Sequence, residues 1–200
     1  LTGDLPYWLA IALATALVIA ALAKPVVTTA LVRTAGVDLI VLQDGSSSMR
    51  VTDVAGDRWR RSMRFLRVVG EALRWEDDRV AMAVFAHIAA PQVRLTTAPN
   101  TYFFFLDHLA EESPFRLEDD TTWDTNIELG VHWGLRLVER DRELAGGSPN
   151  AKAFVLITDG QAWSGEVARS IELARAQRIP IFVVGVGTSA GGRIPEAVPA

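Results

Sequence analysis

The sequence predicts an α/β fold, a doubly wound and mostly parallel sheet with helices on both faces, preceded by a transmembrane helix. Two observations predict the sheet and its helices. Short, nearly continuous apolar runs are typical of buried parallel strands, and they alternate with longer segments in which apolar residues recur every three or four positions. An uncharged apolar segment near the N-terminus predicts the transmembrane helix.

The predicted transmembrane helix covers residues 5–23, LPYWLAIALATALVIAALA, which contain no charged side chain. As a helix, these residues would reach roughly 29 Å, close to the thickness of the hydrocarbon core of a bilayer. Tyr7 and Trp8 lie at one end, where aromatic side chains favour the headgroup region. Two alternatives remain open: a secretory signal peptide, because residues 21–23 resemble a cleavage site, and a buried core helix.

We expect a linker over residues 24–36 and one domain over residues 37–200 whose C-terminal end is truncated. The first strand of this domain is VDLIVL, and a polar cluster follows it. Residues 57–74 form a helix because their apolar positions are spaced four, three, three and four residues apart; these positions are Trp59, Met63, Leu66, Val69 and Leu73. RVAMAVFA is the second strand, and a short strand over 92–95 pairs with it as a hairpin at a sheet edge.

The second half of the domain continues the alternation. The expected elements are a short helix over 100–109, an acidic loop to residue 124, a helix over 126–140, a strand over 153–158 (AFVLIT), a helix over 166–177 and a last strand over 179–186 (IPIFVVGV). Strands and helices in this order give right-handed crossovers and a mostly parallel sheet. Ligands of such sheets bind at the carboxyl ends of the strands.

Composition excludes several classes of function. The chain has 20 Lys and Arg against 24 Asp and Glu, a net charge of −4, so it lacks the basic surface that nucleic-acid binding requires. It has no cysteine, which excludes disulfides, thiolate metal sites and cysteine nucleophiles. Half of its residues are hydrophobic and its mean hydropathy is +0.20, a high value that reflects the N-terminal segment.

Three polar clusters fall at the predicted carboxyl edge of the sheet, and their oxygen atoms favour a hard cation. The residues concerned are Asp44, Ser46, Ser48, Thr125 and Asp159. Mg²⁺ binds to such ligands while it keeps several waters, and Mn²⁺ or Ca²⁺ are alternatives. The first three residues are spaced two apart, so in an extended turn they face the same way. If the neutral hydroxyls bind the ion directly and the carboxylates act through water, the ion keeps much of its charge and would bind an acidic residue of a partner protein.

These residues carry a family resemblance. DGSSS, from Asp44 to Ser48, resembles the DxSxS motif of the von Willebrand factor A (VWA) domain, and Thr125 and Asp159 match the separate Thr and Asp of its metal-ion-dependent adhesion site (MIDAS). The resemblance covers residues 36–188. It implies a VWA, Rossmann-like fold that mediates divalent-metal-dependent protein–protein interaction through the MIDAS.

A narrower pattern is similar to the membrane-anchored bacterial Bat (aerotolerance-associated) family. It consists of an apolar helix ending in AKP, then GVDLI, the DxSxS motif followed by Met49, a Thr52-Asp53 pair, and AGGRIP over residues 190–195. This resemblance implies partnership with other VWA proteins and with a MoxR-type AAA ATPase. It also implies a place in the cell (inner) membrane, with the VWA domain periplasmic, that is, extracytoplasmic.

Several residues near the site have open roles. Asp124 stands where a small residue often precedes the metal-site Thr; it caps the next helix, points to solvent or adds a third carboxylate beside the ion. Trp163 is a candidate rim residue for partner contact. One helix carries six arginines, either as a solvated face or as a docking surface for an acidic partner or anionic lipid; they are Arg58, Arg60, Arg61, Arg64, Arg67 and Arg74.

Two other functions are weighed against metal-dependent adhesion. The alternative is a metal-independent structural scaffold at the membrane. A metal-dependent hydrolase is disfavoured, because no His, Lys or Cys lies near the motif residues to act as a general base. The sequence also contains no GxSxG nucleophile elbow and no Walker phosphate-binding loop. We therefore expect that the protein is not an enzyme.

Overall fold

The computed structural model describes residues 4–22, 36–116 and 123–196 of a chain that forms two compact units, Leu1–Thr34 and Ala35–Ala200. The first unit contains helix α1 (Leu5–Leu22), and the side chains of its residues 17–22 lie outside the described part. Within the part of the chain that the structure describes, no helix is both long and apolar enough to cross a bilayer. The predicted span over 5–23 and the linker over 24–36 reach beyond the described residues and stay predictions.

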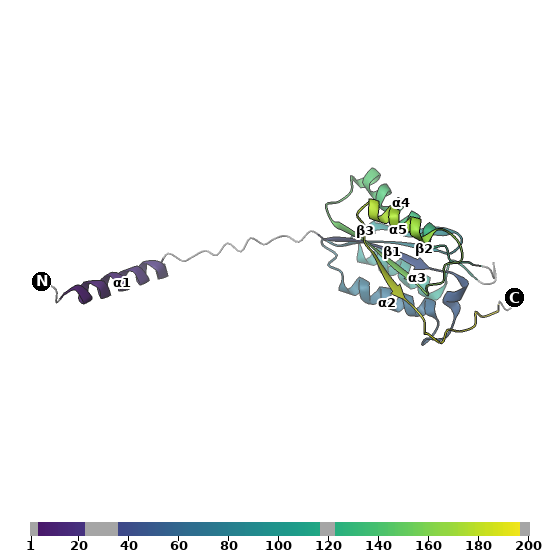
Figure 1. Cartoon of the computed structure of the whole chain (residues 1–200), viewed down its shortest axis with the longest axis horizontal. Helices are drawn as coiled ribbons and strands as arrows, with labels where there is room; N and C mark the ends of the chain where they lie inside the picture. Colours follow the sequence, from purple (N-terminus) through teal and green to yellow (C-terminus); the bar gives the residue numbers. More distant parts are fainter. Residues whose placement is uncertain (1–3, 23–35, 117–122, 197–200) are drawn as a thin grey trace. The chain divides into compact units, whose positions relative to one another are not determined.

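The described part of the second unit is built on a five-stranded sheet with the order β3-β2-β1-β4-β5 (Figure 1). Its strands are β1 (Val37–Asp44), β2 (Arg79–Phe85), β3 (Ala89–Thr96), β4 (Ala151–Thr158) and β5 (Ile181–Gly185). Strand β1 pairs in parallel with β2 and β4, β4 pairs in parallel with β5, and β3 is antiparallel to β2 at the edge. The predicted parallel sheet with an edge hairpin is confirmed, and its strand order reverses at β1, where ligands of doubly wound sheets bind.

Helices cover both faces of this sheet. On one face lie α2 (Arg58–Ala72) and α3 (Pro99–Glu111), and on the other lie α4 (Ile127–Ala145) and α5 (Val167–Ala176) (Figure 1). Successive side chains of a strand point to opposite faces, so Val41 of β1 joins the core with α2 and α3, whereas Ile40 and Leu42 join the core with α4 and α5. All three are fully buried.

Two core-facing residues of helix α4 are glycines, and the helix packs against the sheet at these positions with no room for a Cβ. A Cβ added to Gly130 would lie 2.7 Å from Cδ1 of Phe85, and one added to Gly134 would lie 2.9 Å from Cδ2 of Leu42. The close contact between α4 and the sheet brings the segment before α4 to the carboxyl edge of the strands.

The strands and helices expected in the second unit are all present with shifted ends, whereas the expected acidic loop before residue 124 lies partly outside the described residues. Strand β1 continues to Asp44, and a short 3-10 helix, η1 (Ser47–Arg50), follows it. Helix α4 continues to Ala145 and ends at Gly146, whose φ of 76° is the left-handed conformation that terminates many helices.

Candidate metal site

The loop after β1 forms the first part of the candidate site. Asp44, the last residue of β1, accepts the backbone N–H of Ser46 on Oδ1 at 2.9 Å, and the hydroxyls of Ser46 and Ser48 lie 3.0 Å apart. All three residues are buried. The extended turn expected here is wrong beyond Ser46, because the N–H of Met49 bonds to the carbonyl of Ser46 at 3.0 Å and starts a 3-10 turn. This turn still brings the two hydroxyls together.

Asp44 is a fully buried carboxylate whose negative charge is stabilised by hydrogen bonds from the Ser46 N–H and the Thr158 hydroxyl. Burial raises the pKa of Asp44 to about 6, and the negative charge of Asp159 adds to the rise, whereas hydrogen bonds from Thr158 and Ser46 oppose it. The Thr158 hydroxyl donates to Oδ2 of Asp44 at 2.7 Å. A cation at this place would stabilise the ionised form of Asp44.

Strand β4 supplies the second carboxylate. Its register pairs Gln43 with Ile157, which brings the residues that follow, Asp44 and Thr158, to the same edge. Asp159 comes next, and its side chain is 2% exposed. Oδ1 of Asp159 accepts the backbone N–H of Gln161 at 3.4 Å, so this oxygen is only weakly bonded within the protein.

The segment before α4 supplies the third hydroxyl. The N–H of Ser47 donates to the carbonyl of Trp123 at 3.0 Å, which joins this segment to the loop after β1. Thr125 is 1% exposed, and its carbonyl accepts the N–H groups of Trp163 and Ser164 at 3.1 and 3.4 Å. Among the described residues, the Thr125 hydroxyl has no hydrogen-bond partner. A hydroxyl without a partner, on a residue that is otherwise buried, is suited to a ligand that the chain itself does not supply.

The cap of α4 differs from the one expected. Asn126, not Asp124, is the capping residue, and its side chain accepts the N–H of Leu129 at 2.9 Å. Asp124 is exposed, in agreement with the alternative that it points to solvent. The reason is the position of the helix start: Ile127 is the first helical residue, so the residue directly before it takes the capping role.

Arg58 is the site residue that sequence reasoning missed. Its place in an arginine-rich helix predicts a solvated or docking face, but Arg58 is 8% exposed and its Nη1 donates to Oδ2 of Asp159 at 2.6 Å. One feature of the sequence does indicate that Arg58 is buried. It lies four and eight residues before Ser62 and Leu66, which are buried on the same face of α2. The other five arginines of this set are exposed.

The donor set fits a hard divalent ion that keeps some of its waters. It combines two carboxylates with three hydroxyls, from Asp44, Asp159, Ser46, Ser48 and Thr125. No group of three or more His, Asp or Glu side chains among the described residues could hold a metal ion by itself. A metal at this edge would therefore depend on hydroxyl oxygens, which suit Mg²⁺, Mn²⁺ or Ca²⁺ better than a soft ion.

Aromatic side chains lie next to these donors. The Trp163 side chain is 71% exposed, although its backbone is fixed by the bond to Thr125. Trp123, whose carbonyl bonds to Ser47, stacks on the exposed His87 with ring centroids 4.6 Å apart. The rim therefore offers apolar area to a partner beside a polar centre.

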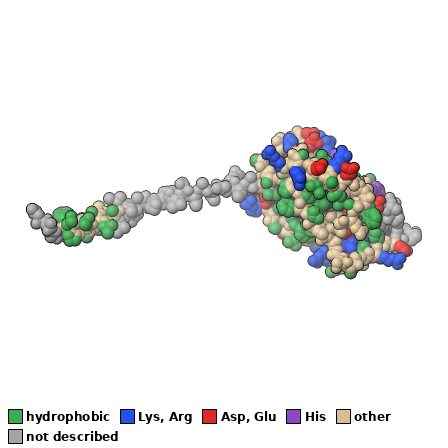
Figure 2. Space-filling view, viewed as in Figure 1, with side chains coloured by type: hydrophobic (Ala, Val, Ile, Leu, Met, Phe, Trp, Pro, Cys, Tyr) green, Lys and Arg blue, Asp and Glu red, His purple; other side chains and the backbone are tan. Residues whose placement is uncertain are grey.

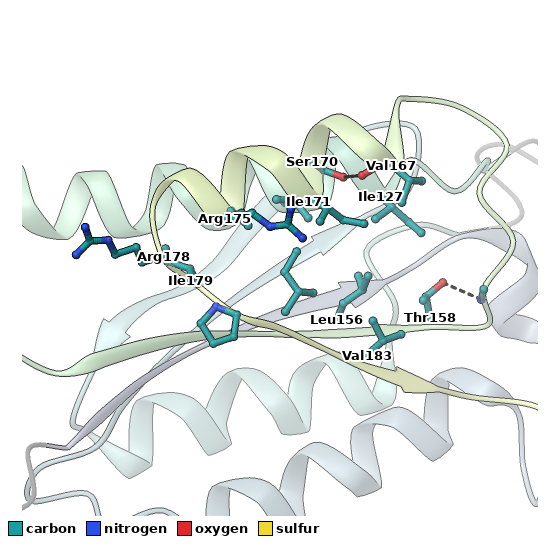
Figure 3. A pocket seen from close by; sticks show the side chains of 15 residues that line it. Ile127, Leu156, Thr158, Val167, Ser170, Ile171, Arg175, Arg178, Ile179 and Val183 are labelled. Carbon is teal, nitrogen blue, oxygen red and sulfur yellow. Dashed lines mark hydrogen bonds between the residues drawn. The ribbon is translucent and has the colours of Figure 1, made fainter.

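A separate groove of about 800 Å³ lies between α5 and the β4–β5 part of the sheet. Figure 3 shows apolar side chains of both elements lining it, with Thr158 at one end and Arg178 at the other. Apolar side chains also gather on the face that carries β5 (Figure 2), where Phe182 and Val183 are 59% and 65% exposed. No acidic or imidazole side chain is among the described residues that line this groove.

Comparison with known proteins places this geometry in a family. The family model described as von Willebrand factor type A domain matches residues 38–194. No protein of curated function matches the sequence.

Solved structures share the fold. The conserved hypothetical protein BatB from Bacteroides thetaiotaomicron is 26% identical, over 80% of this chain and 71% of that chain, with a TM-score of 0.65. An aerotolerance-related membrane protein from Bacteroides fragilis is 23% identical, over 80% of this chain and 72% of that chain, with a TM-score of 0.62. Proximal thread matrix protein 1 from the mussel byssus, with a zinc-occupied MIDAS motif, is 17% identical over 76% of this chain and 38% of that chain, with a TM-score of 0.53.

Proposed function

Because this chain belongs to the von Willebrand factor type A domain family and resembles its Bat-like members, we propose that its candidate site binds Mg²⁺ and, through the ion, an acidic residue of a protein partner. Mn²⁺ and Ca²⁺ are the alternative ions. The family is generally one of interaction and metal-binding modules, and the proposal assigns that role to five residues of this chain: Asp44, Ser46, Ser48, Thr125 and Asp159.

The observation that carries the proposal is the partnerless Thr125 hydroxyl among other oxygen donors. Thr125 is buried at the same edge as the paired hydroxyls of Ser46 and Ser48, and two carboxylates complete the set. Hydroxyl ligands do not neutralise a divalent ion, and Asp159 already shares its charge with Arg58. An ion held there would keep positive charge that a carboxylate from outside can satisfy.

The rim indicates the form of the partner. Trp163 is held beside Thr125 by its backbone and exposes its indole, as residues at interaction hot spots often do. We infer that the partner presents an acidic residue next to an apolar one. Asp124 is exposed on the same segment as Thr125, and its negative charge would disfavour a second acidic residue there.

Membrane attachment and the ATPase partner are further parts of the proposal. The uncharged composition of residues 5–23 supports anchoring in the cell (inner) membrane, and the resemblance to Bat proteins supports a periplasmic domain. The resemblance to Bat proteins supports a complex with other VWA proteins and a MoxR-type AAA ATPase, and one structural neighbour is an aerotolerance-related membrane protein.

The site does not favour an enzyme. The side chain that bonds to Asp159 is the Arg58 guanidinium, which stays protonated and cannot act as a general base at neutral pH. We therefore propose binding without catalysis.

The experiment is a calorimetric titration of the full chain, purified in detergent, with Mg²⁺. Wild type is expected to bind one ion, and Asp159→Ala is expected to lose most of the affinity. Asp107→Ala is the matched control, because Asp107 also pairs with an arginine but is exposed and lies on α3. No binding by the wild type, or equal binding by Asp159→Ala, would leave a metal-independent membrane scaffold as the better function.

A positive titration is followed by a partner test. A MoxR-type ATPase is added to the wild-type chain with Mg²⁺ or with EDTA, and co-purification is measured. The proposal expects capture only with the metal, and capture that EDTA does not change contradicts it.

A further inference from the structure

Arg58 places a permanent positive charge against the candidate metal site. Its guanidinium Nη1 donates to Oδ2 of Asp159 at 2.6 Å and to the carbonyl of Ser48 at 3.5 Å. Both acceptors belong to proposed metal-site residues, and the Arg58 side chain is 9% exposed. In the metal-free protein, the guanidinium thus supplies the countercharge that the buried Asp159 carboxylate needs.

Other contacts hold the guanidinium in this position. Nε and Nη2 of Arg58 each donate to Asp53 at 2.9 Å, as a fork on both carboxylate oxygens. The N–H and the hydroxyl of Thr188 donate to Oδ2 of Asp53 at 2.7 and 3.0 Å. Gly187 lies against the guanidinium, because an added Cβ would come within 2.8 Å of Nε. These bonds to Asp53 and Asp159 therefore hold the Arg58 guanidinium at the site in one position.

A divalent ion would have to share Asp159 with this guanidinium. Oδ2 of Asp159 is committed to Arg58, and Oδ1 has only a bond of 3.4 Å from Gln161. Two cations on one carboxylate repel each other, so binding the ion weakens the bond between Arg58 and Asp159 or leaves the ion with less of the Asp159 charge. Either result lowers the affinity of the site for the ion.

We propose that Arg58 is an internal competitor of the divalent ion, which keeps metal affinity low until an acidic residue of the partner adds negative charge. This inference rests on the proposed function. Metal and partner would then bind cooperatively, because each raises the affinity of the site for the other by the same factor. A purely structural role for Arg58, as a clamp between Asp53 and Asp159, makes the opposite prediction, since loss of the clamp would disorder Asp159 and weaken metal binding.

The test compares Mg²⁺ binding by calorimetry in the detergent-purified full chain and two variants. Arg58→Gln is expected to bind Mg²⁺ about tenfold more tightly, which is the order of effect of one unit charge on a divalent ion a few ångströms away under water-like screening. Arg61→Gln removes the same charge from an exposed position of the same helix and is expected to stay within about twofold of wild type. The metal-free Arg58→Gln protein is expected to melt at a lower temperature than wild type.

The outcomes separate this inference from the proposed function. If the wild type binds Mg²⁺ and Arg58→Gln binds it equally or more weakly, the competitor role is overturned while the metal site stands. If neither protein binds Mg²⁺, the proposed function fails as well.

A second measurement covers the case in which Arg58→Gln does not fold. The assigned Nε–H signal of Arg58 in wild-type NMR spectra is expected to shift during Mg²⁺ titration with the affinity found by calorimetry. A signal that stays constant while Mg²⁺ saturates the site overturns the inference.

Discussion

Replacing Ser48 with alanine separates the metal-binding role of its hydroxyl from its structural role. Ser48 is 7% exposed, and its hydroxyl lies 3.0 Å from that of Ser46. Loss of one such hydrogen bond costs about 1 kcal/mol in the free energy of unfolding, which lowers the melting temperature of a domain of this size by about 2–4 °C. This cost should appear without any metal.

Magnesium adds a second, larger effect. At a concentration one hundred times the dissociation constant, a ligand stabilises the folded state by about 2.7 kcal/mol, which raises the melting temperature by about 5–10 °C. We expect this rise in the wild type and little of it in Ser48→Ala. Loss of a hydroxyl ligand raises the dissociation constant for Mg²⁺, so the same Mg²⁺ concentration saturates much less of the variant. Differential scanning calorimetry of the full chain, with Mg²⁺ and with EDTA, measures both effects.

Ser170→Ala is the matched control. Ser170 is also buried, and its hydroxyl donates to the carbonyl of Val167 at 2.7 Å within α5 (Figure 3). Its replacement should lower the melting temperature by a similar amount and keep the full magnesium effect. A Ser48→Ala protein that gains as much from magnesium as Ser170→Ala does would refute the assignment of Ser48 as a ligand.

Three other predictions concern packing, charge and the rim. Gly130→Ala should destabilise the domain by about 1–2 kcal/mol in urea unfolding, because overlap of the new Cβ with Phe85 outweighs the gain in helix propensity; a neutral or stabilising result would show that α4 can shift away from the sheet. Burial tends to raise the pKa of Asp38, but hydrogen bonds from Arg79, Ser148 and Asn150 hold it below its usual value. Asp38 therefore stabilises the fold above about pH 4, and this contribution disappears as the pH falls through the lowered pKa. Asp38→Asn should cost about 3 kcal/mol at pH 7 and less near pH 3, whereas a cost that does not change with pH would exclude ionisation as the cause. Trp163→Ala should change stability by less than about 0.5 kcal/mol and leave Mg²⁺ binding intact, while it weakens capture of the partner ATPase about tenfold; unchanged capture would remove Trp163 from the interface.

Periodicity and residue type were sufficient to predict the order of elements. The run from Val37 was recognisable because a strand buried on both faces is nearly continuously apolar, and α2 because its apolar residues recur with the helical period. The ends were less predictable. Helix α4 continues to Ala145 through a charged last turn, which apolar periodicity does not reveal.

The candidate site was predictable as a set of residue types and only partly as an arrangement. Asp44, Ser46 and Ser48 are neighbours in sequence, so their proximity followed from local structure, although through a 3-10 turn instead of an extended one. The capping of α4 by Asn126 depended on which residue is the first in the helix, a detail that residue preference alone did not resolve.

The pattern of apolar and polar residues along the chain specifies the α/β class, the parallel strands and the oxygen-rich character of the edge. The packing of distant segments places Arg58 against Asp159, 101 residues away in sequence, and buries Thr125 while its hydroxyl has no partner among the described residues. Both facts depend on how the register of the sheet and the packing of α2 and α4 place distant segments side by side. An arginine on a helix carries no local signal of which carboxylate it will meet.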